Sequence, residues 1–172
     1  KNDIGKKHIR YNGYHELAYL HPNYFKPDES ILNEIGLQKN DKFIIIRFVS
    51  WDASHDVGHH GIKNKILIVK ELEKYGRVLI TSENKLPVEL ESYKIVLSPE
   101  KIHDLLYYAT LYIGEGASMA TESAILGTPS IYISSLVDTM GNFSELSQKY
   151  DLVYAYKDSN DALNKALELI QK

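Results

Sequence analysis

The strongest signal in the sequence is the stretch Ile113-Gly114-Glu115-Gly116-Ala117-Ser118-Met119-Ala120-Thr121-Glu122. A short apolar strand ends at Gly114, small residues follow, and a helix is expected from Ser118. Small residues let a ligand approach the backbone closely, and the start of a helix presents free N–H groups and the positive end of its dipole. This turn therefore suits a diphosphate, with Ser118 or Thr121 as further hydroxyl donors.

Glu122 calls for a different partner, because a carboxylate pointing at a phosphate would repel it. Its two oxygens suit the two hydroxyls of a ribose. A second interpretation is purely structural: an acidic residue in the first turn complements the helix dipole, and small residues ease packing. Glycine-rich turns are common, so spacing alone leaves both interpretations open.

Outward from this turn, apolar runs typical of buried parallel strands alternate with segments of helical spacing. The expected strands are Phe43–Val49, Arg77–Ser82, Tyr93–Leu97, Leu111–Gly114, Ser130–Ile133 and Leu152–Tyr154. The expected helices are Asp28–Ile35, Ile62–Tyr75, Pro99–Ala109, Ser118–Leu126, Asn142–Tyr150 and Ser159–Ile170. This alternation predicts an α/β fold, a Rossmann-like three-layer sandwich with a mainly parallel sheet of about six strands. Ligands of such sheets bind beyond the carboxyl ends of the strands.

The 172 residues fit one domain, which we place at residues 27–172. Residues 1–26 are polar and begin without Met, so we expect an irregular lead-in from a missing N-terminal domain. The formal net charge of −3 does not favour electrostatic binding of nucleic acid. No apolar run approaches the ~20 residues of a membrane span. The absence of cysteine excludes disulfides and thiolate chemistry and suits the cytoplasm, where we expect the protein.

The loop after the first strand gathers imidazoles and carboxylates. Asp52, His55, Asp56, His59 and His60 lie within nine positions. We expect no metal site, because the loop has no cysteine and its glycines leave the ligands without a fixed geometry. His55 and His59 would be one helical turn apart, but Gly58 and Gly61 argue against a helix. His55 and Asp52 are candidates for proton transfer or phosphate contact, and the alternative is a solvated loop with local caps.

Arg47 lies inside a strand that the pattern predicts to be buried. A buried guanidinium must be paired or must reach a ligand at the sheet edge. Asp52 and Glu83 are the candidate partners, and a structural ion pair is the favoured interpretation.

The stretch from Gly114 through Glu122 to the Leu-Gly-Thr-Pro at 126–129 resembles the donor-binding segment of GT-B glycosyltransferases. It is especially similar to UDP-N-acetylglucosamine 2-epimerase. The stretches Gly13–Pro22 and Arg47–Gly58 resemble the family catalogued as domain of unknown function 354, a relative of the epimerase. The resemblance spans nearly the whole chain and implies the C-terminal, donor-binding half of a GT-B fold.

The resemblance also implies a site and a substrate. Glu122 would hold the donor ribose, Gly116, Ala117 and Ser118 would surround the phosphates, and Ile102 would lie near the uracil. The substrate would be a nucleoside-diphosphate sugar, with a UDP-sugar favoured and no tightly bound cofactor. The partners would be the missing N-terminal Rossmann-like domain and, in a homodimer, a second copy.

The loop departs from the epimerase, which has a His-Arg-rich sequence where this chain has Trp51–His55. The reaction, sugar transfer or epimerisation, therefore stays open, and we expect the chain on its own to be inactive. The rival class is a non-catalytic nucleotide-binding or protein-interaction module.

Overall fold

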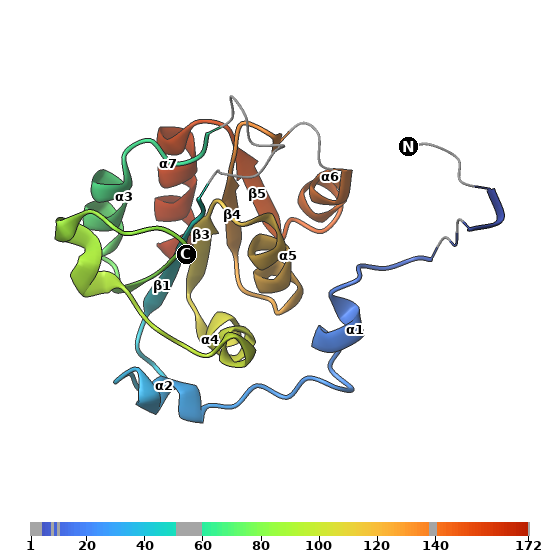
Figure 1. Cartoon of the computed structure of the whole chain (residues 1–172), viewed down its shortest axis with the longest axis horizontal. Coiled ribbons are helices and arrows are strands. Elements are labelled where there is room, and N and C mark those ends of the chain that lie inside the picture. Colours follow the sequence, from blue (N-terminus) through green and yellow to red (C-terminus); the bar gives the residue numbers. More distant parts are fainter. Residues whose placement is uncertain (1–4, 8, 10, 51–59, 138–140, 172) are drawn as a thin grey trace.

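A parallel sheet lies between two layers of helices in the computed structural model, which describes residues 5–7, 9, 11–50, 60–137 and 141–171 (Figure 1). The strands are β1 (Phe43–Phe48), β2 (Arg77–Ser82), β3 (Leu111–Gly114), β4 (Ser130–Ile133) and β5 (Val153–Tyr156). The helices are η1 (Gly5–Lys7), α1 (Leu17–Leu20), α2 (Ser30–Glu34), α3 (Lys65–Leu72), η2 (Val88–Tyr93), η3 (Pro99–Lys101), α4 (Ile102–Tyr108), α5 (Ala117–Ile125), α6 (Gly141–Gln148) and α7 (Ser159–Ile170). The predicted Rossmann-like sandwich is confirmed.

The strand order is β2-β1-β3-β4-β5, and every neighbouring pair is parallel. From β1 the chain first adds β2 on one side and then β3 on the other, so the direction of winding reverses between β1 and β3. At such a switch point the connecting loops diverge to opposite faces and leave a crevice at the carboxyl ends of the strands.

Alternate residues of each strand enter two separate cores, as the pleat requires. Ile44, Ile46 and Phe48 of β1 pack with α3 and α7, whereas Phe43 and Ile45 pack with α2, α4, α5 and α6. Figure 1 shows α3 and α7 on one side of the sheet and α4, α5 and α6 on the other. A sheet buried on both faces explains the unbroken apolar run Phe43–Ile46 that the sequence shows.

The expected strand Tyr93–Leu97 is not part of the sheet, which has five strands. Its only pairing within the described residues is a single parallel bridge between Ile80 and Lys94, with Ile95 N donating to Ile80 O at 2.9 Å. Val96, two residues after the bridge, is 90% exposed. The segment therefore leaves the sheet after one residue and runs toward η3.

Residues 14–28, which we call the N-terminal arm, lie against the domain and include α1. Glu16 and Leu20 are 2% and 3% exposed. The Tyr14 hydroxyl donates to Glu145 of α6 at 3.0 Å, and Asp28 N donates to Asp104 of α4 at 2.9 Å. The end of the segment expected to be an irregular lead-in is thus folded onto the helical layer of α4, α5 and α6.

Candidate functional site

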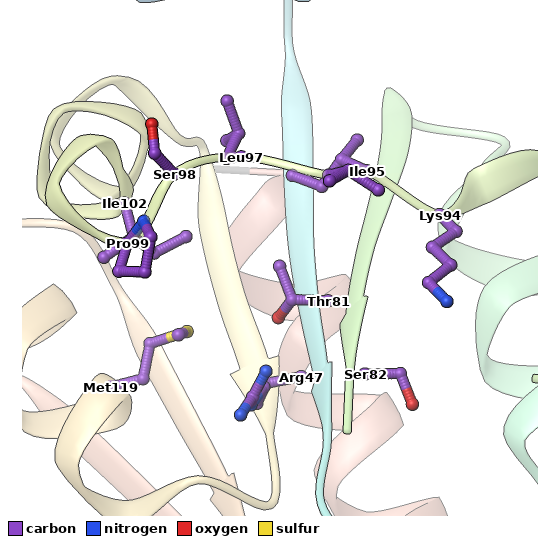
Figure 2. A pocket seen from close by; sticks show the side chains of 11 residues that line it. Arg47, Thr81, Ser82, Lys94, Ile95, Leu97, Ser98, Pro99, Ile102 and Met119 are labelled. Carbon is purple, nitrogen blue, oxygen red and sulfur yellow. The ribbon is translucent and has the colours of Figure 1, made fainter. Parts of the chain in front are cut away.

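A cavity of about 450 Å³ opens at the carboxyl ends of β1 and β2 (Figure 2). Arg47 of β1 and Thr81 and Ser82 of β2 form one side, and Ile102 of α4 and Met119 of α5 form another. The segment that leaves the sheet closes it with Lys94, Ile95, Val96, Leu97, Ser98 and Pro99. Its volume falls within the roughly 300–1,000 Å³ of small-molecule sites.

Arg47 is paired with Glu83, one of the two partners that the sequence suggested. The guanidinium Nη2 lies 2.6 Å from Glu83 Oε1, and Glu83 Oε2 also accepts the N–H of Ser50 at 3.0 Å. Burial alone would raise the pKa of Glu83, but the Ser50 N–H and the Arg47 charge outweigh it and lower that pKa. The arginine side chain remains 23% exposed and lines the cavity, so its charge also reaches the space where a ligand would lie.

Thr81 brings a polar atom without a partner to the same cavity. Its Oγ1 is buried and makes no hydrogen bond with any described residue. Such an atom loses its hydrogen bonds to water and gains nothing from the protein, unless a ligand or water supplies a partner. Thr81 is therefore a candidate polar contact of the cavity, and sequence reasoning did not single it out.

We expect Thr81→Val to leave the free energy of unfolding unchanged or to raise it by up to about 1 kcal/mol, because no hydrogen bond within the described protein is lost. Urea denaturation of the two proteins measures this difference. A loss of more than about 1 kcal/mol would mean that the hydroxyl has a structural partner.

The glycines of the turn after β3 are explained by close packing against β1. A Cβ on Gly114 would lie 2.8 Å from both Arg47 Cβ and Arg47 O, and 2.7 Å from the Tyr112 hydroxyl. On Gly116 it would lie 3.2 Å from Arg47 Cγ. The Tyr112 hydroxyl donates to Gly116 O at 3.1 Å and fixes the turn. The packing interpretation of the small residues thus holds, and it is compatible with a ligand at the same turn.

The start of α5 is open. The helix begins at Ala117, one residue earlier than expected, with Gly116 as its N-cap and no side chain capping it among the described residues. Its first turn carries no acidic residue. Ala117 and Ser118 therefore present uncapped backbone N–H groups beside Met119, which lines the cavity.

The other residues expected to bind the donor differ in their surroundings. Ile102 lies in the cavity wall. Thr121 is 1% exposed and its hydroxyl donates to Ala117 O at 3.1 Å, so it turns into the helix and we leave it out of the site proposed below. Glu122 lies one turn after Ser118, on the same helix face, and contacts Tyr19 and His103.

Glu115 is a residue whose role sequence reasoning missed. It is 4% exposed, and its two carboxylate oxygens accept the N–H of Val49 at 2.8 Å and the N–H of Ile62 at 2.7 Å. These two groups stand at the two ends of the loop after β1. The signal in the sequence was a carboxylate directly after a buried strand and between two glycines, a place where an unpaired charge is costly.

His55 and Asp52 fall in residues 51–59, outside the described residues. The far end of their loop is fixed by His60, whose N–H donates to Ser135 Oγ at 3.1 Å and whose carbonyl accepts from Ser135 N at 3.1 Å. The part of the chain that the structure describes contains no group of three or more His, Cys, Asp or Glu residues able to hold a metal ion.

A doubly wound parallel sheet, a cavity at the carboxyl ends of its strands and an open helix start beside that cavity define a Rossmann-like α/β domain. The chain belongs to the family described as "Protein of unknown function (DUF354)", whose family model matches residues 2–172. Membership in this family, expected from the two sequence stretches above, is confirmed.

Comparison with known proteins finds a relative in sequence and likenesses in fold. The chain is 30% identical over 135 residues to "Uncharacterized protein MJ0665" of Methanocaldococcus jannaschii, covering 74% of this chain and 39% of that protein. Its fold is similar to that of UDP-GlcNAc 2-epimerase from the same organism, with a TM-score of 0.58 and 15% identity over 83% of this chain and 42% of the epimerase chain. A weaker likeness, with a TM-score of 0.44 and 17% identity, links 83% of the chain with 40% of the wall teichoic acid polymerase TagF.

The chain thus spans less than half the length of these proteins. Across the described residues, no helix is long and apolar enough to cross a membrane.

Proposed function

We propose that this domain binds the nucleoside diphosphate of a nucleotide sugar, as the donor half of a GT-B-type glycosyltransferase or sugar-nucleotide epimerase. The observation that carries the proposal is the place of the 450 Å³ cavity: it lies at the carboxyl ends of the strands, directly beside the uncapped start of α5. The fold likeness to UDP-GlcNAc 2-epimerase makes a UDP-sugar the favoured ligand.

Each part of such a ligand has a matching part of the site. The diphosphate would lie at the N–H groups of Gly116, Ala117 and Ser118, where the helix dipole favours negative charge. The base would enter the cavity beside Ile102, between the apolar side chains of Ile95 and Met119. The ribose would reach Glu122, one turn further along α5.

Both candidate reactions require the donor-binding half to stabilise the same developing charge. Transfer of the sugar and elimination of the nucleoside diphosphate both leave negative charge on the departing diphosphate. The start of α5 would stabilise that charge, with the nearby Arg47 guanidinium adding to the field. His55 and Asp52 remain our candidates for proton transfer, and the acceptor side would belong to a second Rossmann-like domain.

The test is calorimetric titration of the protein with UDP, CDP, GDP and ADP. We expect UDP to bind most tightly, and Glu122→Ala to weaken it by about 1.5–3 kcal/mol, because hydrogen bonds to a charged group are lost. Glu89→Ala, which removes an exposed carboxylate of η2, is the matched control and should leave UDP binding unchanged. Equal UDP affinity in the wild type and in Glu122→Ala contradicts the ribose role, and no binding of any nucleotide contradicts the proposed function.

A non-catalytic nucleotide-binding module is the second candidate, since binding alone needs no second domain. Turnover of a nucleotide sugar by a longer chain of this family, lost on substitution of His55 or Asp52, would decide for the enzyme. Cytoplasmic location and a homodimer stay part of the same proposal.

A further inference from the structure

The carboxylate of Glu122 is held by two side chains from other parts of the fold. The Tyr19 hydroxyl of the N-terminal arm donates to Glu122 Oε1 at 2.8 Å. His103 Nε2, in the first turn of α4, lies 3.3 Å from the same oxygen. The second oxygen, Oε2, makes no hydrogen bond with any of the residues that the structure describes, and the Glu122 side chain is 14% exposed. One oxygen is therefore fixed while the other remains available.

Aromatic contacts keep the two holding side chains in place. The rings of Tyr19 and His103 lie 5.4 Å apart at 39°. The Phe25 ring, also from the arm, meets the His103 ring edge-on at 6.4 Å. The helix α1, which carries Tyr19, contacts α5, and Leu20 next to Tyr19 is buried. The packed part of the N-terminal arm thus holds Tyr19 in place, and the rings of Tyr19 and Phe25 hold His103.

Tyr19 acts as a donor over the whole physiological range. Burial and the hydrogen bond to Glu122 both raise the pKa of Tyr19 above its ordinary value, so its hydroxyl stays protonated. A carboxylate offers about four acceptor sites on two oxygens, so Tyr19 and His103 can occupy Oε1 without competing for Oε2.

We infer that Tyr19 and His103 are positioning residues for ribose recognition: they fix Glu122 through Oε1 so that Oε2 is presented to the ribose hydroxyls of the bound nucleotide. The inference rests on the proposed function. A free glutamate samples several rotamers and loses that freedom when it binds a ligand. Holding it beforehand removes this cost and sets the direction of the remaining lone pairs, which is how preorganised sites gain affinity and selectivity.

The experiment compares UDP with 2′,3′-dideoxy-UDP, which lacks both hydroxyls, on the wild type, Tyr19→Phe and Glu122→Ala. We expect Tyr19→Phe to weaken UDP about three- to tenfold, the effect of losing one ordinary hydrogen bond, because Tyr19 acts on the ribose only indirectly, and to leave dideoxy-UDP unchanged. The preference for the ribose hydroxyls then shrinks in the Tyr19 variant and vanishes in Glu122→Ala. The double variant should match Glu122→Ala alone, because Tyr19 acts only through Glu122.

Tyr24→Phe is the matched control, since Tyr24 lies in the same arm but is 78% exposed, and it should change neither affinity. Three results overturn the inference while leaving the proposed function intact: Tyr19→Phe keeps the full ribose preference, weakens both ligands equally, or strengthens UDP, the mark of a tyrosine that competes with ribose. A wild type that binds neither ligand, or both equally, overturns the ribose role of Glu122 and this inference together.

Discussion

Glu115→Ala is expected to lower the free energy of unfolding by about 2–5 kcal/mol. The Glu115 carboxylate is 4% exposed and accepts the N–H groups of Val49 and Ile62. Its removal leaves the buried N–H of Ile62 and the part-buried N–H of Val49 without a partner, at roughly 1–3 kcal/mol each. Urea denaturation measures the loss, provided that the transition stays two-state.

Glu83→Ala is the matched control, because Glu83 accepts a backbone N–H from Ser50 in the same loop and pairs with Arg47. The Glu83 side chain is 42% exposed, so water replaces both contacts and the expected loss is below about 1 kcal/mol. Equal losses in the two variants would mean that burial of Glu115 is not what makes its contacts important. Hydrogen exchange should separate them as well, with faster exchange at Val49 and Ile62 only in Glu115→Ala.

The sequence predicted the elements whose own residues determine them. The final helix, expected and found at Ser159–Ile170, has a regular apolar face and an N-cap at Asp158, whose side chain accepts from Asn160 N and Asp161 N. The strands β1 to β4 are apolar runs bounded by polar or small residues, and their extents were predicted to within one residue.

Elements whose ends depend on their neighbours were predicted less well. Tyr93–Leu97 has the composition of a strand, but only Lys94 pairs with the edge strand β2 before the segment runs on toward η3. The helix expected at Ile62–Tyr75 begins only at Lys65, where the Asn64 side chain accepts from Leu67 N. Ile62 lies before the helix, and its N–H donates to the carboxylate of Glu115. Hydrophobic spacing records none of these tertiary contacts.

The candidate site was predictable only in part, for the same reason. The turn from Gly114 to Glu122 is local, so its residues and the helix that follows could be read from spacing. The partners of Glu122 are not local: Tyr19 lies 103 positions earlier and is brought in by the folded arm. The cavity formed by Thr81 and residues 94–99 depends on where the segment 93–97 leaves the sheet.

Gly114→Ala is expected to lower the free energy of unfolding by about 3 kcal/mol, at the upper end of the cost of overpacking a core. Gly114 of β3 pairs with Arg47 of the neighbouring strand β1. A new Cβ would lie 2.8 Å from the Arg47 carbonyl oxygen and from Arg47 Cβ. Both atoms belong to a buried strand held by β2 on its other side, so they cannot move without breaking ladder hydrogen bonds. Urea denaturation of the variant measures the loss.

Gly116→Ala separates this clash from a general intolerance of side chains in the turn. At Gly116 the backbone angles φ −85° and ψ 108° suit any residue, and the nearest contacts of a Cβ are Arg47 Cγ at 3.2 Å and the Tyr112 hydroxyl at 3.3 Å. Arg47 Cγ belongs to a partly exposed side chain that can shift by a few tenths of an ångström, and both contacts are longer than those at Gly114, so the expected loss is about 1 kcal/mol. An equal or larger loss at Gly116 would refute the packing argument. Suppose that Gly114→Ala loses stability while Gly116→Ala stays stable but binds UDP less well. Gly114 is then needed for packing within the sheet, and Gly116 for binding the ligand.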